Sequence, residues 1–163
     1  MTQISENFTL QELCKSQTAQ RLRIENNPTT EHLINMVYLI DRVLQKIRDH
    51  FGIVVVSSGY RSTKLNEKIG GSENSQHSKG QAIDFEVPGV SNLAVARWIQ
   101  EELEFDQLIL EFYEPGDPNS GWIHLSYVEP TITGKYNRNE VLTATAVSGK
   151  VEYSVVDLTK FEG

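Results

Sequence analysis

The stretch that organises this chain reads Ser75-Gln76-His77-Ser78-Lys79-Gly80-Gln81-Ala82-Ile83-Asp84. A further histidine, His124, follows Asp84 by forty positions, in the apolar run Trp122-Ile123-His124-Leu125-Ser126. Two imidazoles and one carboxylate suit Zn²⁺, and three protein ligands leave a fourth position open for water. An open position distinguishes a catalytic zinc site from a structural one. The pattern therefore predicts a catalytic metal site formed by His77, Asp84 and His124.

The setting of these three residues supports that interpretation. His77 follows a loop rich in glycine and serine, Asp84 interrupts an otherwise apolar strand, and His124 lies between two aliphatic residues. A polar group among core residues needs a partner, and one shared cation would satisfy all three. A lone histidine is more often exposed or hydrogen-bonded than a ligand. We interpret His32 and His50, on or at the end of a long helix, as solvated.

Length and composition are those of one globular domain, which we expect to span residues 1–163 as a monomer. The net charge of −7 argues against nucleic acid and against an anionic membrane surface as partners. Cys14 is the only cysteine, which excludes an intramolecular disulfide and a thiolate-rich metal site and is typical of a reducing compartment. The polar N-terminus does not resemble a signal peptide, and no apolar run is long enough for a spanning helix.

Hydrophobic periodicity predicts an α+β domain in which N-terminal helices pack on a small, mainly antiparallel sheet that carries the zinc site. Thr9 should cap a first helix, and apolar residues at spacings of three and four predict a long amphipathic helix from Glu31 to Phe51. Residues 92–103 should form another helix. The predicted strands are residues 53–58 (a buried strand), 81–87, 105–112 and 122–128, with a hairpin of residues 140–146 and 150–156 at the edge of the sheet.

Several motifs resemble those of the zinc D-Ala-D-Ala carboxypeptidases of the M15 peptidase family, which is similar to the hedgehog signalling domain and to several bacteriophage endolysins. The resemblance covers about residues 7–150. The motifs are Ser57-Ser58-Gly59-Tyr60-Arg61-Ser62, Asn66, Gly70-Gly71, Ser75-x-His77-x-x-Gly80-x-Ala82-x-Asp84 and Trp122-x-His124.

This resemblance implies that the two histidines and the aspartate bind Zn²⁺ and that Arg61, sixteen residues before His77, holds the substrate. A guanidinium donates a planar fork of hydrogen bonds, which fits a peptide's C-terminal carboxylate or a developing oxyanion. The alternative for Arg61 is a structural salt bridge that fixes the turn at Gly59. By resemblance alone, Ser75 and Gln76 orient the first ligand or contact substrate.

Zinc-dependent hydrolysis also needs a base, and here the chain departs from the family. Many M15 members carry an acidic residue three positions before the last histidine, where this chain has Gly121, and several carry a histidine where it has Trp122. We favour Glu111, because it ends an apolar strand that would pair with the His124 strand in a hairpin. The hedgehog-like branch carries a glutamate at a similar position, with the spacing of Asp106 to Glu111.

A solvated carboxylate at the end of a strand is the alternative interpretation of Glu111. Glu114 and Asp117 are weaker candidates for the base, since a mobile loop positions a base poorly.

The resemblance implies a zinc metallopeptidase that hydrolyses peptidoglycan stem peptides, as a D-Ala-D-Ala carboxypeptidase or an endopeptidase. Without a signal peptide, the chain resembles a phage endolysin that is made in the host cytoplasm and acts at the bacterial cell wall after release. A bacterial carboxypeptidase is an alternative enzyme. The alternative from another class is a zinc-containing binding or virion-structural protein of the same fold that cleaves nothing.

Overall fold

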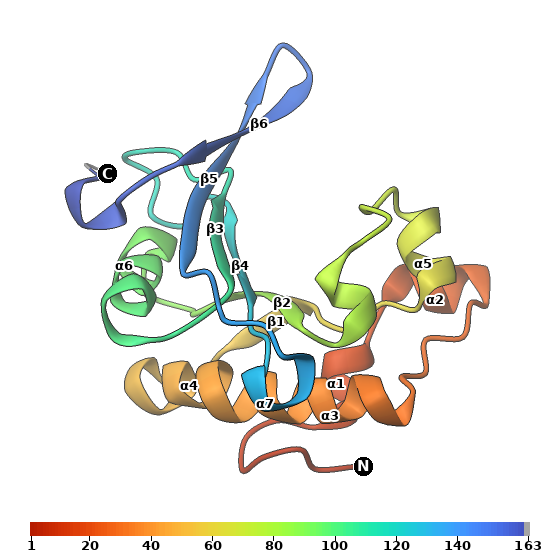
Figure 1. Cartoon of the computed structure of the whole chain (residues 1–163). Coiled ribbons are helices and arrows are strands. Elements are labelled where there is room, and N and C mark those ends of the chain that lie inside the picture. The colour runs from red at the N-terminus through yellow and green to blue at the C-terminus, as the bar shows by residue number, and fades with distance from the viewer. Residues whose placement is uncertain (162–163) are drawn as a thin grey trace.

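The computed structural model describes residues 1–161 and shows helices first, followed by a six-stranded sheet (Figure 1). The helices are α1 (Leu10–Cys14), α2 (Gln17–Leu22), α3 (Thr30–Leu39), α4 (Gln45–Phe51), α5 (Thr63–Lys68), α6 (Asn92–Glu102) and α7 (Pro130–Thr133). A π-helical segment, Ile40–Leu44, joins α3 to α4, and 3₁₀ turns cover Gln76–Lys79 and Leu158–Lys160. The strands are β1 (Val55–Ser58), β2 (Ala82–Glu86), β3 (Gln107–Glu111), β4 (Trp122–Ser126), β5 (Glu140–Val147) and β6 (Lys150–Val155).

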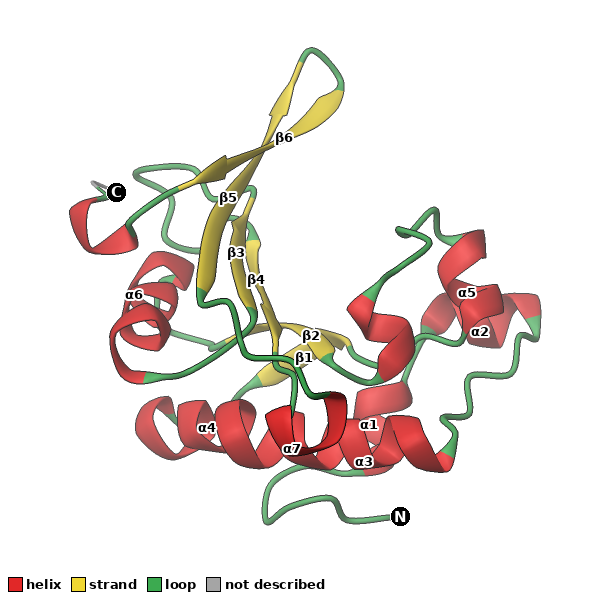
Figure 2. Ribbon diagram, in the orientation of Figure 1, coloured by secondary structure: helices red, strands yellow, loops and turns green. Residues whose placement is uncertain are grey.

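The strands lie in the order β1-β2-β4-β3-β5-β6. Every neighbouring pair is antiparallel except β3 and β5, which run parallel. This arrangement confirms the predicted α+β class and the mainly antiparallel sheet. The outer parts of β5 and β6 extend away from the body of the molecule as a twisted hairpin (Figure 2).

The long predicted helix is present, with a π-helical turn in its middle. Thr29 caps its first turn by accepting a hydrogen bond from the backbone of His32, and Gly52 ends it with a φ of 97°, which an L side chain rarely adopts. Its inner face belongs to the same buried cluster as β2 and α6. Ile34 and Val37 belong to the apolar residues whose spacing predicted the buried face of this helix, but they are 43% and 44% exposed.

One local expectation was wrong, and another was wrong only in part. The run at residues 53–58 forms an edge strand that pairs only with β2, so Val55 is 51% exposed and not buried. Of the two histidines that we interpreted as solvated, His50 is exposed, as predicted, whereas His32 is half-buried, and both rings contact aromatic side chains. His32 Nδ1 lies 3.1 Å from the Tyr60 hydroxyl, and the ring of His50 stacks on Trp98 with centroids 4.4 Å apart. Aromatic neighbours from distant segments provide these contacts, which helical periodicity cannot reveal.

The two faces of the sheet differ in chemistry. One face is fully buried and supplies the core with Ile83, Phe85, Leu108, Leu110, Ile123 and Leu125. The alternate residues of β2, β3 and β4 therefore point to the opposite face, because side chains alternate along a strand. That face carries Asp84, Glu111, Trp122 and His124. Within residues 1–161, no helix combines the length and the apolar character needed to cross a membrane.

Candidate metal centre

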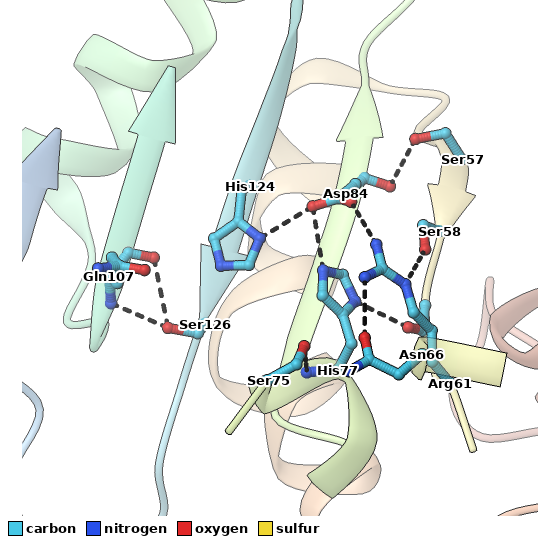
Figure 3. Close-up of polar contacts among 11 residues, drawn as sticks. Ser57, Ser58, Arg61, Asn66, Ser75, His77, Asp84, Gln107, His124 and Ser126 are labelled. Atoms are coloured by element: carbon cyan, nitrogen blue, oxygen red, sulfur yellow. Dashed lines mark hydrogen bonds and ion pairs between the residues drawn. The ribbon is translucent and has the colours of Figure 1, made fainter. Parts of the chain in front are cut away.

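Three side chains from three different elements converge on one point (Figure 3). Asp84 on β2 lies directly opposite His124 on β4, and its Oδ1 is 2.9 Å from His124 Nδ1. His77 comes from the 3₁₀ turn, and its Nε2 is 3.3 Å from the same carboxylate oxygen. Each residue offers one ligand atom, and the three atoms lie within 4.8 Å of one another.

These atoms fit a zinc ion. Tetrahedral Zn²⁺ holds nitrogen and carboxylate ligands at about 2.0–2.2 Å, which separates neighbouring ligand atoms by about 3.4 Å. The two separations from Asp84 Oδ1, 2.9 Å to His124 Nδ1 and 3.3 Å to His77 Nε2, are near that value. Two imidazoles and one carboxylate also leave room for a fourth, non-protein ligand, as catalytic zinc sites require.

The surrounding backbone fixes the orientation of His77. Its Nδ1 lies 2.8 Å from the carbonyl oxygen of Gly59, which can only accept, so Nδ1 carries the proton and Nε2 faces the site. The Ser75 hydroxyl accepts a hydrogen bond from the backbone N–H of His77 and caps the 3₁₀ turn. Gly80 ends that turn with a φ of 72°, and a Cβ there would collide with the carbonyl oxygen of His32.

Electrostatics favour a neutral imidazole and an ionised carboxylate. Burial lowers the pKa of His77, against the opposing effect of Asp84. Burial alone would raise the pKa of Asp84, but the hydrogen bond from His124 and the adjacent imidazole of His77 hold it well below its usual range. Both groups therefore have the protonation states that metal coordination requires near neutral pH.

Arg61 lies beside this cluster and is held by three partners. Its Nε donates to the Ser58 hydroxyl at 3.0 Å, Nη1 to Asn66 Oδ1 at 3.5 Å, and Nη2 to Asp84 Oδ2 at 3.3 Å. Burial lowers the pKa of Arg61, whereas the charges of Asp84 and Glu111 raise it. Arg61 therefore does form a salt bridge, but with the clustered carboxylate, and its guanidinium also lines the cavity in front of the cluster.

Glu111 occupies the position that the hairpin prediction gave it. It lies opposite Trp122 in the β3–β4 pair, while Ile109, two residues earlier, lies opposite His124. Burial raises the pKa of Glu111, the charge of Asp84 raises it further, and His124, Trp122 and Arg61 offset part of the effect. Glu111 is half-buried and is not a solvated carboxylate. Such a group can exchange a proton nearer to neutral pH than an ordinary glutamate.

One cavity of about 680 Å³ is lined by the three candidate ligands, by Arg61 and Glu111, and by Ser75 and Gln76. Glu114 and Asp117 do not line it and instead face each other in the β3–β4 loop. Gly121 could not carry the acid that many family members place there, since its φ is 67° and a Cβ would collide with the carbonyl oxygen of Glu111. The backbone of the Glu111 strand thus occupies the space of that missing side chain.

A second polar network lies behind the first, and sequence reasoning missed it. The buried carboxylate of Asp106 accepts three hydrogen bonds from Arg138, at 2.8, 3.0 and 3.2 Å, and one from the Gln76 side chain at 3.0 Å. Gln76 precedes His77, so this network connects the C-terminal part of the chain to the metal loop. Asp106 could have been found from the sequence, because it is an acid at the start of an apolar strand. Nothing in the sequence marked Arg138.

Comparison with known proteins agrees with this geometry. No curated protein gives a significant match to the chain. The sequence profile described as Peptidase M15 matches residues 6–126. That range covers most of the chain and holds His77, Asp84, His124, Arg61 and Glu111. Residues 1–5 and residues 127–163, which include the two C-terminal strands, lie outside it. The protein therefore belongs to the Peptidase M15 family of zinc-dependent peptidases.

Proposed function

We propose that this zinc peptidase hydrolyses the stem peptides of peptidoglycan, with His77, Asp84 and His124 as zinc ligands, Glu111 as the general base and Arg61 as the substrate-binding cation. The observation that carries the proposal is the single cavity that brings these five residues together. An arginine fork, a carboxyl group with a raised pKa and a three-ligand metal cluster are the groups that peptide hydrolysis needs.

Bound Zn²⁺ would lower the pKa of a water molecule and polarise the peptide carbonyl. Glu111 takes the proton from the attacking water as the C–O bond forms. It then gives that proton to the amine nitrogen as the C–N bond breaks, so that the carboxylate is restored after each turnover. Its half-buried position and raised pKa suit both transfers.

Arg61 binds the negatively charged part of the substrate. Its Nη1 contact to Asn66 is long, at 3.5 Å, so the N–H groups of this nitrogen can donate to a substrate carboxylate while Nε remains on Ser58. A guanidinium that binds a terminal carboxylate favours removal of the last residue, as in a D-Ala-D-Ala carboxypeptidase. An endopeptidase would instead present a carbonyl oxygen to the same arginine.

We further propose that the enzyme acts as a phage endolysin, synthesised in the host cytoplasm and released to the cell wall. Membership in the Peptidase M15 family and the resemblance to endolysins support this proposal. The competing function is a zinc-containing binding or virion-structural protein that cleaves nothing. Glu111 and Arg61 argue against it, because pure binding does not require a carboxylate with a raised pKa beside the metal cluster.

Digestion of purified peptidoglycan, followed by mass analysis of the fragments, tests the function. Loss of a terminal D-alanine identifies a carboxypeptidase, and a cut within the stem or cross-bridge identifies an endopeptidase. Release of no product by the zinc-loaded protein would favour the binding protein.

Metal content tests the site separately. Wild-type protein should contain one zinc ion per chain, and His77→Ala should lose it. Glu111→Gln should retain zinc but hydrolyse no peptide. His50→Ala is the matched control, since His50 lies outside the cavity on Trp98, and it should keep both metal and activity. Full activity in Glu111→Gln would assign the base to another residue.

A further inference from the structure

We propose that the exposed face of the β5–β6 hairpin, with Tyr153 as its anchor and Val155 beside it, is a remote subsite for the acyl side of a long peptide substrate. This inference rests on the proposed function in its carboxypeptidase form. It concerns a part of the chain that lies beyond the family match, which ends at residue 126.

The hairpin and the metal cluster share one cavity. Leu142 from β5 and Tyr153 from β6 line the same space as His77, Asp84 and His124. Figures 1 and 2 show the hairpin rising beside the end of β3. A substrate bound at the metal cluster can therefore reach Tyr153 within one cavity.

Strand register places the hairpin residues on the same face as the cluster. Paired residues of neighbouring strands point to the same side of a sheet. One row runs from His124 through Ile109 and Leu142 to Val155. The adjacent row of pairs runs in the same direction from Trp122 to Tyr153, through Glu111 and Ala144.

The distance fits a peptide of defined length. Three strand spacings of about 4.8 Å separate β4 from β6, so Tyr153 lies about 14 Å from the strand that carries His124. An extended peptide advances about 3.4 Å per residue and covers this span with about four residues. A five-residue stem peptide that loses its last residue has four residues on the acyl side of the cleaved bond.

The position of Arg61 sets the direction of the peptide. Arg61 follows β1 and binds Asp84 on β2, so it lies on the side of the cluster away from β3, β5 and β6. A terminal carboxylate on Arg61 places the leaving residue on that side. The acyl residues then extend over β3 and β5 toward Tyr153.

The surface of the hairpin has the chemistry of a binding platform. Tyr153 is 58% exposed and Val155 81% exposed, although both are large apolar side chains. Every residue of β6 is exposed, so the hairpin itself leaves this face uncovered. An aromatic ring beside aliphatic groups can bind the methyl groups and backbone of a peptide by burying apolar surface.

Steady-state kinetics on two substrates test the subsite. The long substrate is a stem pentapeptide, and the short one is its last three residues with an acetylated N-terminus. Wild type should show a lower KM for the pentapeptide. Tyr153→Ala should raise that KM by about tenfold and leave the tripeptide unchanged, since only the pentapeptide reaches the ring. Tyr153→Phe, which keeps the ring, should behave as wild type.

Glu152→Ala is the matched control, because Glu152 lies on the same strand and points to the opposite face. It should change neither KM. Calorimetry of pentapeptide binding to Glu111→Gln, with and without Tyr153→Ala, should give the same tenfold loss without turnover.

Four results would overturn the subsite. Equal KM values for the two peptides in wild type, or an equal effect of Tyr153→Ala on both, would contradict it while the proposed function stands. A change in molecular mass on Tyr153→Ala, measured by light scattering, would make this face a contact between copies of the chain. If wild type cleaves neither peptide, the carboxypeptidase function fails together with the subsite.

Discussion

Asp106→Ala tests whether the polar network behind the cluster holds the metal loop in place. Asp106 is 5% exposed and accepts four hydrogen bonds, three from Arg138 and one from Gln76. A hydrogen bond to a buried charged group contributes about 1.5–3 kcal/mol. The Arg138 side chain is 54% exposed, and solvent screening reduces the contribution of its hydrogen bonds to stability. We therefore expect the free energy of unfolding to fall by about 3 kcal/mol.

Urea denaturation of the metal-free protein measures this loss, and the midpoint should fall by about 1–2 M. Zinc affinity, measured by competition with a chromophoric chelator, should fall by about tenfold because Gln76 precedes the first ligand. Glu140→Ala is the control, since it removes the more distant partner of Arg138, at 3.8 Å, and one hydrogen bond from Gln107, and leaves Asp106 in place. It should change stability by less than about 1 kcal/mol.

The stabilisation by Asp106 should also change with pH in a definite direction. Burial alone would raise the pKa of Asp106, but the hydrogen bonds from Arg138 lower it below its ordinary value of 3.8. The stabilisation is then present above pH 3.8 and is lost as the pH falls through the lowered pKa. Wild-type stability in the Asp106→Ala variant would refute the energetic argument. Reduced stability with unchanged zinc affinity would refute the link to the metal loop.

Three further predictions concern the cavity itself. Gly121→Glu should not supply a second base, and it should lower the melting temperature, because the positive φ and the carbonyl of Glu111 leave no room for a Cβ. The acidic limb of the kcat/KM profile should lie above pH 4.5, because activity is lost as the pH falls through the raised pKa of Glu111; a limb at or below 4.5 would contradict this. Arg61→Lys should raise KM by about tenfold or more and weaken zinc binding, since one ammonium cannot bond Asn66 and Asp84 as the fork does; an unchanged KM would remove Arg61 from substrate binding.

The sequence was sufficient to predict the clustering of the three candidate ligands. Period-two alternation put Asp84 on the face opposite Ile83, and the turn-rich loop before Trp122 made the β3–β4 hairpin predictable. Hairpin pairing then placed Glu111 on the strand beside His124. These inferences succeeded because they depend on local periodicity and short loops.

Contacts between distant segments could not be predicted in the same way. The parallel pairing of β5 with β3 brings Tyr153 to the cavity, yet no pattern in the tail indicates which strand it joins. The carbonyl of Gly59 that orients His77 is a backbone group, so it leaves no mark on residue type. Arg138 pairs with Asp106 across 32 positions, and its sequence neighbourhood resembles an ordinary surface loop.

The two histidines present different ring nitrogens to the same point, Nε2 from His77 and Nδ1 from His124. The remaining proton must then reside on Nδ1 of the first ring and on Nε2 of the second, so the bound protein contains opposite tautomers. In ¹⁵N-resolved NMR spectra of the imidazole rings, Nδ1 should be the protonated nitrogen and Nε2 the metal-bound nitrogen in His77, and the reverse should hold in His124. Each ligand can thereby be assigned spectroscopically in the wild-type protein, without any substitution.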